Sequence, residues 1–204
     1  WFSYQPDPDL QQVIVDMSVP ELKQIEFRGI PLGELVLPSL RWILRRHHLK
    51  DDPTTRFLFR EFILSADNIA REFQGLLERI SPQAIVVFNG LQYPEAVVRW
   101  LALQQDIRVI THEVNLQPFS AFFTDGHATI YPMDLPGDFK LNDVQSLRLD
   151  RYLKKRFRGD FTMAGIQFWS DMNQLSDEFL ALAGAFEAIV PVFTNVVFDT
   201  SQAH

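Results

Sequence analysis

Cysteine is absent from the 204 residues of this chain. A chain without cysteine cannot form disulfides, thiolate metal sites or a thiol nucleophile. This composition fits a reducing compartment, and we expect a cytoplasmic location. The sequence also lacks an apolar run long enough to cross a bilayer, so no membrane span is expected.

Positive charge is scarce as well, because 19 Lys and Arg residues face 26 Asp and Glu residues and the net charge is −7. Nucleic-acid binding depends on a concentrated basic surface that neutralises phosphates. The charge balance therefore argues against nucleic acid as the main partner. The composition, with 47% hydrophobic and 22% charged residues, is otherwise that of a globular protein large enough to bury a core.

Several widespread catalytic motifs are missing, namely Gly-x-Gly-x-x-Gly, the phosphate loop, His-Glu-x-x-His and Gly-x-Ser-x-Gly. Hydride transfer on a dinucleotide fingerprint, P-loop nucleotide hydrolysis and zinc proteolysis therefore have no support. Asp7-Pro8-Asp9 has the spacing of the Asp-x-Asp metal signature of one class of sugar transferases. Because no strong strand precedes these residues, we expect no metal site there.

Residues 84–113 have the pattern strand, helix, strand. The apolar run Ala84 to Phe88 ends at Asn89-Gly90, a pair typical of turns. A helix with Pro94 in its first turn follows, and Ile107 to Ile110 form a second β-branched run. Strands joined in this way are nearly always parallel neighbours with a right-handed connection. We therefore predict that both strands lie at the centre of a sheet and are buried on both faces.

Polar residues follow both predicted strands at their carboxyl ends. Asn89 and Gly90 follow the first strand, and His112 and Glu113 follow the second. Because the carboxyl ends of neighbouring parallel strands share one edge, where ligands bind in open α/β sheets, we predict a site there. Taken singly, each residue is also explained as an ordinary turn or loop residue, and that alternative stays open.

Aromatic residues lie in the irregular segment beyond Glu113. Phe119, Phe122 and Phe123 would either stack on sugars or bases, or cover the sheet, and both interpretations stay open. His127 precedes a short strand predicted over residues 128–131, and a lone histidine is more often structural than catalytic.

The residues before this stretch predict a short strand at Val13 to Val15 and then several helices. Ser18 and Glu21 have the spacing of a capping box. Leu37 to Leu44 predict a helix that ends in the cationic run 45–50. Asp52 and Pro53 predict the start of a long helix that reaches Ile80. Near the C-terminus, helices are predicted over residues 147–157 and 168–182, and a β-rich run over 188–198.

Several segments of the sequence resemble a known group of enzymes. Val86 to Gly90, followed by a helix and by Ile107 to Glu113, is similar to bacterial sugar transferases of the GT-B type, in particular those grouped with capsule and surface-polysaccharide biosynthesis. Residues 28–33 and 193–199 resemble the same group. The likeness covers most of residues 27–200, and Val114-Asn115 stand where the group usually has Arg-Gly.

The resemblance implies two facing Rossmann-like domains with a cleft between them. The expected fold is α/β: a Rossmann-like three-layer domain with a mostly parallel sheet, resembling the N-terminal half of a GT-B fold. Residues 1–183 would form the acceptor-side domain without its first strand and helix. Residues 184–204 would begin a second, truncated donor-side domain.

The resemblance also implies a function. The chain would be a fragment of a glycosyltransferase that moves a sugar from a nucleotide-sugar donor to a polysaccharide or glycan acceptor, with no metal or other cofactor. The fragment alone is expected to be inactive. Glu113 or His112 would deprotonate the acceptor hydroxyl; the ordinary pKa of histidine suits this task, whereas Glu113 would need burial to raise its pKa. The predicted substrate contacts are Asn89, Gly90, Asn115, Phe119, Phe122 and His127.

Two alternatives to the transferase stay open, because a fold does not determine a function. One is a non-catalytic carbohydrate-binding or scaffold domain of the same fold. The other is a protein similar to nucleotide-sugar epimerases.

Overall fold

The computed structural model describes residues 3–115, 119–126, 128, 135–156, 162–163, 166–167, 176–187 and 190. These residues belong to two units. The first unit contains residues 3–113, 122–126 and 128, and the second contains the other described residues.

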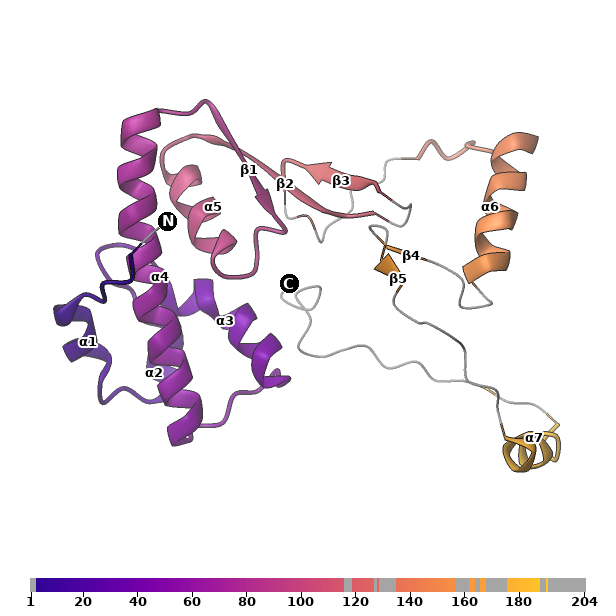
Figure 1. Ribbon diagram of the computed structural model, residues 1–204, viewed down its shortest axis with the longest axis horizontal. Coiled ribbons are helices and arrows are strands. Elements are labelled where there is room, and N and C mark those ends of the chain that lie inside the picture. Colours follow the sequence, from indigo (N-terminus) through magenta and orange to yellow (C-terminus); the bar gives the residue numbers. More distant parts are fainter. Residues whose placement is uncertain are drawn as a thin grey trace. The chain divides into compact units, whose positions relative to one another are not determined.

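The first unit is mostly helical (Figure 1). Helices α1 (Pro8–Ile14), α2 (Val19–Lys23) and α3 (Leu32–Leu44) precede the long helix α4 (Pro53–Ile80). Strand β1 (Ala84–Phe88), helix α5 (Glu95–Gln104), and strands β2 (Arg108–Val114) and β3 (Ala121–Thr124) follow in the chain. Helix α4 contacts α1, α2, α3 and α5, so it is the element on which the other helices pack.

The local sequence explains both ends of α4. Asp52 accepts a hydrogen bond from the Thr55 N–H at 2.8 Å, and Pro53 occupies the first helical position, as predicted. Ser81 ends the helix in the left-handed conformation with φ of 49°. Phe59, Ile63, Ala66 and Ala70 lie on the buried face, at the spacing that helical periodicity requires.

The hydrophobic core lies between helices. Leu10, Leu22, Val36 and Phe59, from α1, α2, α3 and α4, are each fully buried. Val97 and Leu101 of α5 belong to the same cluster. The strands contribute little to this core, because Val87 and Val109 form a small second cluster with Ala102.

The strand predicted at Val13 to Val15 is wrong, because these residues end α1. Asp7 caps this helix and Pro8 opens it, so the chain is already helical when it reaches the β-branched run. The helical period then places Leu10 and Ile14 on one buried face and leaves Val13 and Val15 about half exposed.

Helices α2 and α3 approach each other closely. The capping box predicted at the start of α2 is present, since the Ser18 N–H donates to Glu21 Oε2 at 2.8 Å. At the start of α3, a Cβ on Gly33 would lie 2.1 Å from the Leu22 carbonyl oxygen and 2.6 Å from that of Lys23. Only glycine therefore fits at this helix contact.

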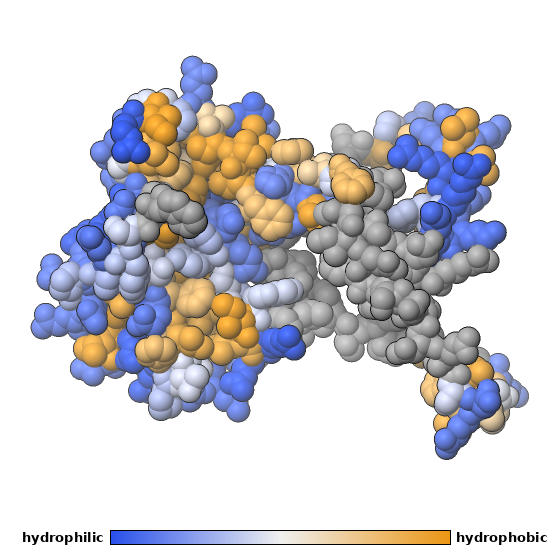
Figure 2. All heavy atoms as spheres, viewed as in Figure 1, coloured by the Kyte–Doolittle hydropathy of each residue, from blue (hydrophilic) through white to orange (hydrophobic). Residues whose placement is uncertain are grey.

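The strands β1 and β2 are parallel neighbours, as predicted, with Val86 paired with Ile110 and Phe88 paired with His112. They are not both central, because the strand order β1-β2-β3 places β1 at an edge. They are also not buried on both faces, since Val86 is 58% exposed and Phe88 is 43% exposed. In Figure 2, hydrophobic residues reach the surface over this part of the molecule.

The predicted Rossmann-like three-layer domain with a mostly parallel sheet is wrong. The sheet is a small mixed sheet of three strands, and the described residues are mainly helical. The strand–helix–strand pattern of residues 84–113 determines one crossover only, whereas a layered sheet needs further strands. Residues 8–80 cannot supply them, because their helical periodicity places them in α1 to α4.

The second unit contains α6 (Asp143–Arg156), β4 (Thr162–Met163), β5 (Ile166–Gln167) and α7 (Asp177–Ala183). Strands β4 and β5 are antiparallel. Helix α6 corresponds to the helix predicted over residues 147–157, and its last turn carries Lys154, Lys155 and Arg156. Ser176 caps α7, accepting from the Phe179 N–H at 3.1 Å.

Several predictions fall on residues outside the described part of the chain. The helix predicted over 168–182 is described only from residue 176, where α7 agrees with it, and the strand predicted over 128–131 is described only at Ala128, which lies in a turn. The β-rich run over 188–198 is described only at Val190, which is in no regular element. The domain boundary between residues 183 and 184 stays a prediction. Within the described residues, no helix is both long enough and apolar enough to cross a membrane.

Candidate functional site

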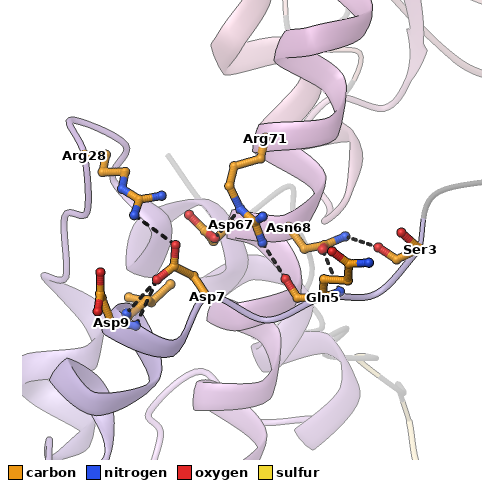
Figure 3. A network of polar contacts seen from close by, with 9 residues as sticks. Ser3, Gln5, Asp7, Asp9, Arg28, Asp67, Asn68 and Arg71 are labelled. Atoms are coloured by element: carbon orange, nitrogen blue, oxygen red, sulfur yellow. Dashed lines mark hydrogen bonds and ion pairs between the residues drawn. The ribbon is translucent and has the colours of Figure 1, made fainter.

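A polar network joins the N-terminal segment to α4 (Figure 3). Asp7 accepts from the N–H groups of Asp9 and Leu10 at 2.9 and 3.2 Å, and it forms an ion pair with Arg28 at 2.9 Å. The bond from the Leu10 N–H and the other contacts lower the pKa of the Asp7 carboxyl. Asp7 is therefore a helix cap. Within the described residues, no group of three or more His, Asp or Glu side chains could hold a metal ion.

Two buried residues of α4 complete this network. Asn68 accepts from the Gln5 N–H at 2.8 Å and donates to the Ser3 carbonyl at 3.1 Å, so one side chain binds the backbone of an extended segment twice. Asp67 is 1% exposed and accepts from Arg71 Nε at 2.9 Å. Burial raises the pKa of Asp67, and Arg71 opposes this rise. These side chains serve the structure, because each has a partner within it.

A cleft lies where α3 ends and α4 begins. Asp52 in its wall is already the N-cap of α4 and accepts from the Thr55 N–H. The cleft contains none of the predicted site residues and is lined by Leu44, Arg46, Asp52, Pro53, Thr54 and Thr55.

The carboxyl edge of β1 and β2 brings together Asn89 and Glu113. Asn89 Nδ2 donates to Glu113 Oε2 at 2.9 Å, and the Asn89 N–H donates to the His112 carbonyl at 2.7 Å. The Leu91 N–H donates to Asn89 Oδ1 at 3.1 Å, which fixes the amide from its other side. Asn89 is 5% exposed and has a φ of 55°, in the left-handed region. A buried amide therefore orients a half-buried carboxylate.

His112 and Glu113 point to opposite faces of the sheet, because consecutive side chains alternate along a strand. The ring of His112 lies beside those of Phe88 and Phe123, with centroids 5.3 and 5.6 Å away. Glu113 shares its face with Thr111, which is fully buried. The structure thus separates the side chains of the two residues predicted as a base, and Asn89 Nδ2 donates to that of Glu113.

Gly90 occupies a position that only glycine fits. Its φ is 84°, and a Cβ on it would lie 2.8 Å from the Thr111 methyl group and 2.9 Å from Arg99 Cδ. The aliphatic stem of Arg99, a residue of α5, therefore lies against the turn that follows β1.

Arg99 is a functional candidate that the sequence reasoning missed. Its side chain is half-buried, and burial lowers the pKa of its guanidinium. Among the residues that the structure describes, none accepts a hydrogen bond from Arg99 or forms an ion pair with it. The only signal in the sequence was a cation within the apolar stripe of residues 96–101.

Three of the other predicted contacts are among the described residues, and one is not. Phe122 is half-buried on β3 in the first unit. Asn115 and Phe119 belong to the second unit, where the Asn115 N–H donates to the Ser120 carbonyl at 3.1 Å and Phe119 is 90% exposed. His127 is outside the described residues.

Comparison of the chain with protein-family models, with curated proteins and with solved structures finds no match. Its function must therefore be inferred from the chemistry at the carboxyl edge of β1 and β2. That edge presents a carboxylate oriented by an amide, and a partly buried cation on the adjoining helix. A carboxylate of this kind can accept a proton, and a cation of this kind can bind an anion.

Proposed function

We propose that this chain is part of a glycosyltransferase that moves a sugar from a nucleotide-sugar donor to a glycan acceptor. The observation that carries the proposal is the 2.9 Å hydrogen bond from Asn89 Nδ2 to Glu113 Oε2 at the adjoining ends of two parallel strands. Sugar transfer needs a base that takes the proton of the acceptor hydroxyl. A carboxylate held in one orientation by a buried amide suits that role.

Each residue has a distinct part in the proposed reaction. Glu113 accepts the hydroxyl proton while the acceptor oxygen bonds to the sugar and the bond from the sugar to the diphosphate breaks. Asn89 is a positioning residue, since it holds the carboxylate through Oε2. His112 has no part in this step, because it faces the other side of the sheet with Phe88 and Phe123. A cytoplasmic location and a reaction without a cofactor belong to the same proposal.

The test is turnover by the natural full-length protein with a panel of UDP- and GDP-sugars and glycan acceptors, in which the release of UDP or GDP and the mass of the product are measured. We expect activity with at least one pair, and Glu113→Gln should reduce kcat by about 100- to 10,000-fold without loss of the fold, since glutamine cannot take the proton. Glu72→Gln is the matched control, because Glu72 is an exposed residue of α4. Equal kcat in Glu113→Gln and the wild type would remove Glu113 from the mechanism.

A second candidate function is carbohydrate binding without catalysis. The row Phe88, His112 and Phe123 crosses the three strands on the face opposite Glu113, and Phe88 and Phe123 are 43% and 59% exposed. Exposed apolar patches of this kind often mark binding surfaces. On this alternative, Phe123→Ala would abolish glycan binding, Glu113→Gln would leave it intact, and no nucleotide sugar would be turned over.

A further inference from the structure

Arg99 differs in its partners from two other arginines of the first unit, Arg41 and Arg71. Arg41 is also partly buried, but its Nε donates to the His47 carbonyl at 3.1 Å. Arg71 is paired with Asp67. Arg99 has neither kind of partner among the described residues, although burial disfavours its charged form.

The surroundings of Arg99 keep its side chain at the carboxyl edge of β1. Its Cδ and Nε would lie 2.9 and 3.6 Å from a Cβ on Gly90, so the absence of a side chain there provides the space that the stem of Arg99 fills. Asn89, directly before this glycine, holds Glu113. No ion pair joins Glu113 and Arg99, although both belong to this edge, so the positive charge of Arg99 is not neutralised within the described structure.

We propose that Arg99, lying across Gly90 at the carboxyl edge of β1, binds an oxyanion of the substrate, a phosphate or a carboxylate. A guanidinium offers paired N–H donors that match both groups, and a bound oxyanion would replace the hydration that burial removes. The choice of substrate rests on the proposed function, whereas the anion site itself does not. The oxyanion has two sources, namely the diphosphate of the donor or an acidic group on the acceptor.

The experiment is calorimetric titration of the natural full-length protein with inorganic pyrophosphate, UDP and glucuronate. We expect Arg99→Gln to raise the Kd of at least one of these probes by about 10- to 100-fold, the range that a hydrogen bond to a charged group contributes. Arg99→Lys should give an intermediate Kd, because it keeps the charge and loses the paired donors. Arg79→Gln, which removes a charge from the exposed last turn of α4, should leave every Kd unchanged.

The probe that responds identifies the source of the oxyanion. A loss with pyrophosphate and UDP assigns Arg99 to the donor diphosphate, and a loss with glucuronate alone assigns it to an acidic acceptor. Equal Kd values in Arg99→Gln and the wild type for all probes would overturn the proposal, as would an equal loss in Arg79→Gln. If circular dichroism shows that Arg99→Gln does not fold, the Kd values of Arg99→Lys are compared with those of the wild type instead. Equal values for all probes would then overturn the proposal.

The two proposals fail in different ways. Binding of a probe that depends on Arg99, without turnover of any nucleotide sugar, would overturn the transferase and leave the anion site. Turnover with unchanged kcat and KM in Arg99→Gln would overturn the anion site and leave the transferase.

Discussion

Two buried polar side chains of α4 and the half-buried Arg99 at the carboxyl edge of β1 differ in whether they have partners. In the helices, Asp67 is paired with Arg71, and Asn68 binds the backbone of Ser3 and Gln5. At the strand edge, Arg99 has no partner among the described residues. Asp67 and Asn68 therefore form hydrogen bonds that stabilise the fold, whereas Arg99 forms no such bond with the described residues.

This difference is the basis for proposing an anion site at Arg99. Removing a cation from water without a partner destabilises the fold. We propose that Arg99 is retained because a ligand uses it. The glycines of the two regions also differ, in the kind of atom that surrounds them. Gly33 is enclosed by backbone carbonyls, whereas Gly90 is enclosed by the side chains of Thr111 and Arg99, of which Arg99 can move.

The largest effect is expected for Gly33→Ala. Its new methyl group would lie 2.1 Å from the Leu22 carbonyl oxygen, and neither helix backbone can move away without losing core contacts. We expect a loss of about 3 kcal/mol or more in the free energy of unfolding, measured by urea denaturation. Gly75→Ala in α4, which meets no atom within 4 Å, should instead gain about 0.5–1 kcal/mol. Similar values for the two variants would show that α2 and α3 are not in close contact.

A smaller effect is expected for Asn68→Ala, which leaves the Gln5 N–H and the Ser3 carbonyl without their side-chain partner. The free energy of unfolding should fall by about 1–2 kcal/mol, and a protease should cleave the released segment before Asp7 faster. Gln74→Ala, on the exposed side of the same helix, should change neither value. Unchanged cleavage in Asn68→Ala would mean that the segment is held by other contacts.

The smallest effect concerns pH and the exposed ion pair of Asp51 with Arg56. The hydrogen bond from Arg56, together with that from the Val19 N–H, lowers the pKa of Asp51 to about 2. Because this value lies below the ordinary pKa of 3.8, the stabilisation is present above about pH 4 and is lost as the pH falls toward 2. Asp51→Asn should therefore flatten the dependence of stability on pH between 2 and 4. An unchanged slope would show that the pair contributes nothing.

The sequence allowed the crossover to be predicted but not the size of the sheet. The parallel pairing of β1 with β2, and hence the meeting of Asn89 with Glu113, follows from short apolar runs and the handedness of one connection. The number of strands depends on distant residues, and α1 to α4 supply none. The β-branched run Val13 to Val15 predicts a strand by composition, but the cap at Asp7 starts α1 before this run, so the run continues a helix.

Two features of the site differ in how far the sequence could reveal them. The separation of His112 from Glu113 was predictable, because it follows from the alternation of side chains along any strand. The role of Arg99 was not, since the lack of a partner is a property of the folded arrangement and not of any pattern in residues 95–104. Polar groups whose partners are distant in sequence, such as Asn68 and Ser3, were hidden for the same reason.

The central claim, that Arg99 is kept for a ligand and not for stability, is tested most directly by the free energy of unfolding of Arg99→Met without ligand. Methionine retains much of the aliphatic stem and removes the charge. We predict a free energy of unfolding equal to that of the wild type or higher by up to about 1 kcal/mol. Arg41→Met, which loses the bond to the His47 carbonyl, should be less stable than the wild type. A loss of more than about 1 kcal/mol in Arg99→Met, equal to that of Arg41→Met, would contradict the claim.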